Sequence, residues 1–106
     1  MDENAKILAL SSMAHRSRLA ILRMLVIAGP EGQSAGEISE HLGVVPSSLS
    51  FHLKEMLGGA LVSARREGTF IYYSARFETI GGVINFLIEN CLTDVERGSI
   101  RRINEM

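Results

Sequence analysis

Residues 36–73, GEISEHLGVVPSSLSFHLKEMLGGALVSARREGTFIYY, decide the fold of this chain of 106 residues. Their apolar spacing and turn residues predict a helix, a short turn, a second helix, and then two strands joined by a basic turn that contains glycine. A winged helix-turn-helix has this order of elements, and its second helix fits the major groove of DNA. The stretch therefore predicts a winged helix-turn-helix fold, mainly α with a small β-hairpin.

Local signals set the limits of the two helices in this stretch. Ser34 opens a capping box, so the first of these helices should start there and run to Leu42. Pro46 stands at the expected start of the second, a position that favours proline, and that helix should run to Leu57. A glycine follows the end of each helix, as is common where helices stop.

The hairpin and the helix after it are predicted from their composition. Strands are expected at residues 61–66 and 70–73, joined by Glu67-Gly68-Thr69. Ser74 can cap the next helix, which should span roughly residues 75–92. That helix is apolar on more than one face, which is too apolar for a lone surface helix.

Two helices should precede the stretch and a polar tail should follow the last helix. The first helix is expected to have Asn4 as its N-cap and to end near Met13. The second should start at His15 and stop at Gly29. The tail, residues 93–106, should fray or form a short extra helix.

Length and charge narrow the class of protein. One DNA-binding and dimerisation domain is expected at residues 1–92, ahead of the C-terminal tail. The formal net charge of −1 excludes a generally basic, histone-like protein. Residues 44–76 nevertheless carry a net charge of +2, between segments of −1 and −2. The positive excess falls where the stretch predicts DNA, and a phosphate backbone responds to local charge.

Cysteine content and the N-terminal sequence bear on the compartment. Cys91 is the single cysteine, so no disulfide can form within the chain. Residues 1–10 begin acidic, and their apolar run is too short and interrupted for a signal peptide or a membrane span. These features lead us to expect a cytoplasmic protein that does not contact a membrane.

Small hydroxyls and one lysine lie opposite the leucines of the second motif helix. Ser47, Ser48 and Ser50 can donate hydrogen bonds to phosphates or base edges. The start of a helix also favours phosphate through its dipole. Lys54 is expected to contact a phosphate. This face of the helix is the predicted DNA-reading surface.

Two residues of the same helix leave alternatives open. His52 is either a partly buried packing residue, which we favour, or a donor to a phosphate at the edge of the groove. Phe51 is either partly buried, which we favour, or in apolar contact with the methyl group of a thymine.

The hairpin adds a basic wing to the predicted DNA-binding residues. Side chains alternate sides along a strand, so one of Arg65 and Arg66 should face solvent and reach the DNA backbone or minor groove. The other can pair with an acid such as Glu67. Thr69, in the turn, completes the predicted set. The alternative for any one of these residues is an ordinary solvated surface position.

Together these segments resemble the ArsR/SmtB family of bacterial winged-helix repressors, over nearly the whole chain. The segments that carry the resemblance are residues 14–22 (AHRSRLAIL), 50–56 (SFHLKEM) and 71–73 (IYY). Residues 29–32 (GPEG) and 87–91 (LIENC) are similar to the branch of the family that contains arsenite sensors. The resemblance implies a homodimer paired through the first and last helices, an inverted-repeat operator in double-stranded DNA, and release from that operator when an inducer binds.

The sensor sites of the family are incomplete in this sequence. A thiol site in the family needs a Cys-x-Cys pair, where this chain has residues 37–41, EISEH. A zinc-type site needs Asp and His ligands on the last helix, and residues 75–92 contain neither. Arsenite sensors have adjacent cysteines, whereas Leu92 follows Cys91 here. Soft metals and arsenicals bind through several thiolate or imidazole ligands. We therefore assign no cofactor and keep an arsenical or metal inducer only as an alternative.

Three interpretations of Cys91 remain. It can be a buried small apolar residue of the dimer helix, a redox or electrophile switch, or a residual ligand for an arsenical or metal. His15 and His41 are lone imidazoles on different predicted helices, so neither forms a metal site by itself.

Three classes of function can be weighed on these residues. A dimeric, sequence-specific repressor fits the helix-turn-helix, the basic wing and the resemblance. A winged helix used as a protein-interaction module is the alternative, because the net charge is small and the terminal helices are apolar. An enzyme is not expected, because the sequence shows no nucleophile–base pair, paired acids or phosphate loop at useful spacing.

Overall fold

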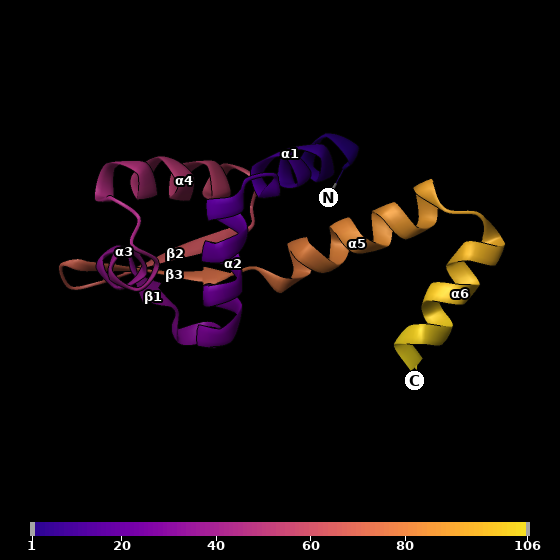
Figure 1. The fold of residues 1–106 in the computed structure, drawn as a ribbon. Helices are drawn as coiled ribbons and strands as arrows, with labels where there is room; N and C mark the ends of the chain where they lie inside the picture. Colours follow the sequence, from indigo (N-terminus) through magenta and orange to yellow (C-terminus); the bar gives the residue numbers. More distant parts are fainter. Residues whose placement is uncertain (1, 106) are drawn as a thin grey trace.

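The computed structural model describes the backbone of residues 2–105 and the side chains of residues 2–100. Figure 1 shows helices packed around a small sheet, with the last two helices leading away from this body. The elements, in chain order, are α1 (Glu3–Met13), α2 (Arg16–Ala28), the 3-10 turn η1 (Gly29–Glu31), β1 (Gln33–Ser34), α3 (Ala35–Leu42), α4 (Pro46–Gly58), β2 (Val62–Glu67), β3 (Phe70–Ala75), α5 (Phe77–Cys91) and α6 (Asp94–Glu105).

The helix-turn-helix has the limits that its capping signals predict. The Ser34 side chain accepts from the backbone N–H of Glu37, and the Glu37 carboxylate accepts from the N–H of Ser34. Gly43 ends α3 in the left-handed conformation, with φ of 65°. Pro46 is the first residue of α4. Local chemistry alone therefore determines the boundaries of α3 and the start of α4.

The wing is part of a three-stranded antiparallel sheet, where two strands were predicted. The order of strands is β1-β3-β2, and the short β1 pairs Gln33 with Tyr73. The strands β2 and β3 join through Gly68 and Thr69, since Glu67 already pairs with Phe70. Gly68 has φ of 62°, a backbone conformation that glycine adopts without strain and that two-residue hairpin loops require.

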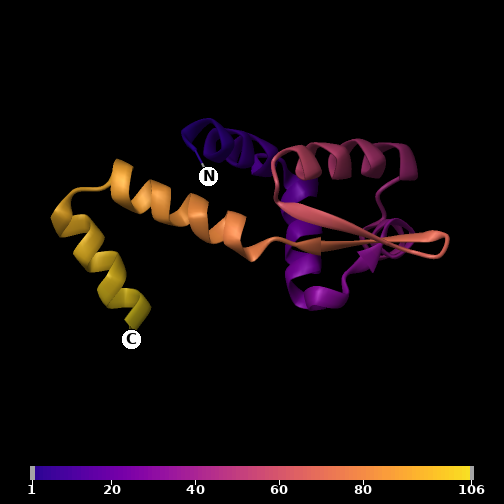
Figure 2. The ribbon, with the colours of Figure 1, turned by 180° about the vertical axis from the view of Figure 1, so that it is seen from behind.

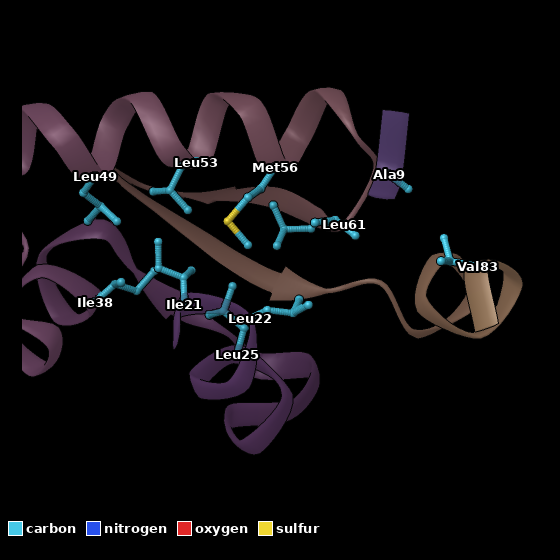
Figure 3. Packing of buried hydrophobic residues seen from close by; sticks show 11 residues of the cluster. Ala9, Ile21, Leu22, Leu25, Ile38, Leu49, Leu53, Met56, Leu61 and Val83 are labelled. Carbon is cyan, nitrogen blue, oxygen red and sulfur yellow. The ribbon is translucent and has the colours of Figure 1, made fainter. Parts of the chain in front are cut away.

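One apolar core joins α1, α2, α3, α4, β2 and α5. Figure 3 shows its side chains converging from α2, α3, α4 and the start of β2. The buried apolar residues are Ala9, Ile21, Leu22, Leu25, Ile38, Leu49, Leu53, Met56, Leu61, Val62 and Val83. This core fixes α4 on the body by one face only and leaves its other face to solvent.

Two of the predicted helix caps are wrong. Asp2, not Asn4, caps α1, because its carboxylate accepts from the backbone N–H of Ala5. The helix α5 begins at Phe77 after Arg76, so Ser74 remains in strand β3 and does not cap it. The first cap is decided locally, whereas Ser74 is held in the sheet by its pairing with Ser63.

The C-terminal part extends from the body, as both Figure 1 and Figure 2 show. Of the two expectations for the tail, the structure has the short extra helix, α6. The helices α1 and α5 pack on each other, and Lys6 Nζ lies 5.0 Å from the centre of the Phe86 ring. None of the helices described is long and apolar enough to cross a bilayer.

Candidate DNA-binding surface

The start of α4 is open to an anion. Val45 is its N-cap, and no side chain among the described residues caps this turn. The exposed residues Ser47 and Ser48 follow Pro46 directly. Backbone N–H groups without helical partners and the positive end of the helix dipole both favour a phosphate at such a position.

The predicted polar contacts of α4 lie on one exposed face. Ser47, Ser50 and Lys54 are all exposed, and their spacing places them along the same side of the helix. The opposite side packs into the core through Leu49, Leu53 and Met56. Leu57, near the end of the helix, is 39% exposed and does not belong to this buried side.

Phe51 points to solvent, which corrects the favoured expectation of partial burial. Its side chain is 56% exposed, although it belongs to the helix whose other face forms the core. The guanidinium carbon of Arg18, on α2, lies 5.7 Å from the centre of the Phe51 ring. A large apolar side chain therefore stands on the outer face of α4 beside a cation.

His52 packs inside, as favoured from the sequence. It is 8% exposed, and its Nδ1 accepts a hydrogen bond from Arg18 Nε at 3.1 Å. The ring of His15, which caps α2 by accepting from Ser17 N–H, lies 4.5 Å from the His52 ring. Burial, and next the charges of His15 and Arg18, lower the pKa of His52. Because Nδ1 accepts the hydrogen bond from Arg18, the neutral form of the His52 ring carries its proton on the other nitrogen.

Arg65 anchors the wing to the body. Its guanidinium donates to the backbone carbonyls of Pro30 and Glu31, at 3.3 and 3.2 Å, and to the carboxylate of Glu67 at 3.1 Å. The same group lies 5.5 Å from the centre of the Tyr72 ring. The predicted pairing with Glu67, the last residue of β2, is therefore present.

Arg66 and Thr69 are the exposed polar residues at the outer part of the wing. Arg66 pairs across the sheet with Ile71, and its side chain has no hydrogen-bond or ion-pair partner among the described residues. Thr69 lies in the two-residue loop and is exposed. Figure 1 shows the wing tip and the start of α4 at the same end of the molecule, away from α5. The start of α4 and the tip of the wing therefore lie at one end of the molecule.

The remaining candidate ligands do not gather. Among the described residues there is no group of three or more His, Cys, Asp or Glu side chains that could hold a metal ion. Cys91 is exposed at the end of α5, and His41 contacts the backbone carbonyl of Glu37 on α3. In the single chain the Cys91 thiol is therefore open to solvent.

Sequence reasoning missed Arg18. This residue lies 34 positions before His52, and its apolar neighbours indicated only a core-facing helix. The one available signal was its position inside residues 14–22, the first segment that carries the family resemblance.

Comparisons with known proteins place the chain among helix-turn-helix regulators. The family model described as "Helix-turn-helix domain" matches residues 13–63. The HTH-type transcriptional regulator YgaV of Escherichia coli is 37% identical over 75 residues, which are 71% of this chain and 74% of YgaV. The transcriptional activator HlyU of Vibrio cholerae is 32% identical over 89 residues, 82% of this chain and 80% of HlyU.

Solved structures share the fold. The structure of HlyU from Vibrio cholerae superposes on this chain with a TM-score of 0.65 at 29% identity. The match covers 87% of this chain and 100% of the HlyU chain. An ArsR-like transcriptional regulator from Rhodococcus superposes with a TM-score of 0.73 at 20% identity, covering 96% of this chain and 89% of that one. The chain is therefore similar to these proteins in sequence and in fold, and it belongs to the ArsR/SmtB family of winged helix-turn-helix, DNA-binding transcriptional regulators.

Proposed function

We propose that this protein is a dimeric, sequence-specific repressor that binds an inverted-repeat operator in double-stranded DNA, acts in the cytoplasm and has no catalytic activity. Residues 1–92 form its DNA-binding and dimerisation domain, and residues 93–106 are a C-terminal appendage. The observation that carries the proposal is the outer face of α4, where hydroxyls and a lysine are exposed while the inner face is fixed in the core.

The roles of the proposed DNA-binding residues differ by position. Ser47 and Ser48 bind phosphate at the open start of α4, and Lys54 binds phosphate further along. Ser50 and Phe51 face base edges in the major groove. His52 contributes by packing. Its remaining ring N–H is the one group of this side chain that can donate to a phosphate at the edge of the groove.

On the wing, Arg66 and Thr69 contact the backbone or the minor groove of the adjacent DNA. Arg65 holds the wing at its angle through Pro30 and Glu31, and its half-exposed side chain adds to the positive potential there. The local charge of residues 44–76 thus serves the same surface that α4 presents.

Dimerisation follows from the apolar surface that α1 and α5 leave uncovered. A single chain exposes 53% of Ile7 and 51% of Leu8 on α1, and 53% of Phe77 and 51% of Ile84 on α5. Large exposed apolar residues gathered on two packed helices are costly in water and mark an interface. When two copies pair through these helices, the dimer presents two recognition helices. These enter successive major grooves, which lie about one helical turn apart.

Selection from a pool of randomised duplex DNA tests this function. The purified protein should enrich an inverted repeat whose half-sites lie about one helical turn, or 10–10.5 base pairs, apart. Transcription in vitro from a promoter that contains the enriched site should fall as protein is added. A protein that enriches no sequence is not a sequence-specific regulator, and a rise in transcription would make it an activator, as HlyU is named.

An inducer that releases the protein from DNA is part of the proposal. An exposed thiol at the end of α5 makes a redox- or thiol-responsive regulator acting through Cys91 the second candidate mechanism. A DNA-release assay should compare arsenite, divalent metals, oxidants and reactive sulfur species, with Cys91→Ser as the control. Release by any of these that survives the substitution excludes every mechanism that needs Cys91.

A further inference from the structure

We propose that Phe51 selects operator sequence by contacting the 5-methyl group of a thymine, and that Arg18 on α2 is the positioning residue that holds the Phe51 ring for this contact. The proposal rests on the DNA-binding function proposed above and names what its central side chain recognises. It also assigns a role to a residue outside the helix-turn-helix itself.

The surroundings of Phe51 on α4 set it apart. Its neighbours along the same face, Ser47, Ser50 and Lys54, are polar and exposed. Phe51 is 56% exposed among them, so its ring contributes little to the core. Exposure of this aromatic ring to water is unfavourable in the free protein. That cost in free energy is recovered when an apolar group covers the ring.

Arg18 makes two contacts with α4 from one planar group. Its Nε donates to Nδ1 of His52 at 3.1 Å, and its guanidinium carbon lies 5.7 Å from the centre of the Phe51 ring. The first contact fixes the direction of the guanidinium, because the buried His52 cannot move away from its packed position. The second then places a cation beside the ring, within the range of a cation–π interaction.

His52 restrains the Phe51 ring on a second side. The two ring centres are 5.9 Å apart and the ring planes meet at 62°, an edge-on arrangement. His52 is supported from behind by the ring of His15 at 4.5 Å. Phe51 is therefore held in one orientation before DNA arrives, which lowers the entropy lost on binding.

The thymine methyl is the apolar group that the major groove offers to such a ring. Of the four bases, only thymine presents a methyl group in the major groove, beside donors and acceptors. Covering one methyl-sized group contributes about 0.8 kcal/mol, which corresponds to about fourfold in affinity. An ordered phenyl ring at a recognition helix can therefore discriminate thymine from a base without the methyl.

Replacement of thymine by uracil tests the contact, since uracil lacks only that methyl group. The operator enriched by the wild-type protein is prepared with uracil at each thymine of one half-site in turn. We expect one position at which the wild-type protein binds about fourfold more weakly to uracil. With Phe51→Ala, the ratio of affinities for thymine and uracil at that position should fall to about one.

Arg18→Lys and Lys54→Ala separate positioning from electrostatics. Lysine at position 18 keeps the charge but lacks the planar group that serves both contacts, so the thymine/uracil ratio should fall while the dependence of affinity on salt stays the same. Lys54→Ala is the matched control: it should weaken binding to both operators equally and leave the ratio at about fourfold. Circular dichroism and thermal unfolding confirm that each variant is folded.

Each outcome decides one part of the proposal. If no thymine shows a ratio that depends on Phe51, the assignment of Phe51 is overturned although the DNA-binding function stands. If the ratio depends on Phe51 and survives Arg18→Lys, Arg18 is not a positioning residue. If the wild-type protein enriches no operator at all, the proposed function itself fails, and the inference with it.

Discussion

Arg18 and His52 join the start of α2 to the middle of α4 through one hydrogen bond, with Arg18 Nε donating to His52 Nδ1 at 3.1 Å. This bond requires an unprotonated Nδ1, because a protonated imidazole has no acceptor on its ring. His52 is nearly buried, so neither water nor another side chain readily replaces the contact. This contact between α2 and the recognition helix therefore depends on the neutral state of His52.

Stability should consequently depend on pH through His52. Burial and the nearby charges of His15 and Arg18 lower its pKa in the folded protein below the usual 6.5. The unfolded chain then takes up the proton at a higher pH than the folded protein does. The contribution of His52 to the free energy of unfolding is therefore complete above about pH 7.5. It decreases as the pH falls through 6.5 towards the lowered pKa of the folded state.

Chemical denaturation across this pH range measures the effect against His52→Asn. The asparagine amide offers an acceptor at the position of Nδ1 and does not titrate. We expect the difference in unfolding free energy between the wild-type protein and the variant to shrink as pH falls. A difference that stays constant with pH would show that His52 does not carry the dependence.

Gly59 should be essential for the packing of α1 on the end of α4. A Cβ atom at Gly59 would lie 2.0 Å from Ser12 Oγ and 2.7 Å from Ser12 Cβ, and Ser12 is buried with its hydroxyl bonded to the Ala9 carbonyl at 2.9 Å. Gly59→Ala should lower the free energy of unfolding by about 1–3 kcal/mol, because two packed elements must separate. Thermal and urea unfolding measure this loss.

Gly58→Ala is the matched control for that variant. A Cβ atom at Gly58 meets nothing within 4 Å, and the residue is the last of α4. Alanine there should leave stability unchanged or raise it by up to about 1 kcal/mol. Equal effects of the two substitutions would mean that the close approach of α1 to Gly59 does not limit the fold.

Ile84→Glu should separate the proposed dimer. Ile84 is 51% exposed on α5 in the single chain, and a carboxylate in an apolar interface loses its hydration without gaining a partner. Sedimentation velocity should show a dimer for the wild-type protein and a monomer for the variant. Asn85→Glu, at the adjacent exposed position of α5, should remain a dimer. A dimer that persists in Ile84→Glu would place the interface elsewhere.

Arg66→Ala should weaken DNA binding uniformly across sequences. Arg66 lies exposed on the wing with no partner among the described residues, so its loss should cost the protein little stability. If each wing of a dimer loses one phosphate contact, the slope of log affinity against log salt should become shallower by about 1.8. Arg76→Ala, at the opposite end of β3 from the hairpin turn, should leave the slope unchanged. Equal slopes for all three proteins would remove Arg66 from the DNA-binding surface.

Local signals were sufficient to predict the helix-turn-helix from sequence. Ser34 with Glu37, and Pro46 at the start of α4, act within one turn of helix, so their spacing in the sequence predicts their contacts. The strand β1 was missed because it is two residues long and exists through pairing of Gln33 with Tyr73, 40 positions away.

The same distinction explains the candidate site. The exposed hydroxyls and Lys54 follow from helical periodicity once the core face is known. The outward position of Phe51 follows from the same periodicity, since Phe51 lies two residues from both Leu49 and Leu53. Its contact with Arg18 does not, because that contact forms only when α2 and α4 pack together. The anchoring of Arg65 by Pro30 and Glu31 is non-local in the same way.

Salt dependence of DNA binding tests the central claim most directly. A duplex containing the enriched operator is titrated with wild-type protein at several salt concentrations, and log affinity is plotted against log salt. A DNA-binding dimer that uses the start of α4, Lys54 and Arg66 should give a steep negative slope, about −0.9 for each phosphate contact. Ser50→Ala combined with Arg66→Ala should weaken binding at every salt concentration. A flat slope, with affinity unchanged in the double variant, would contradict DNA recognition and favour a winged helix that binds protein.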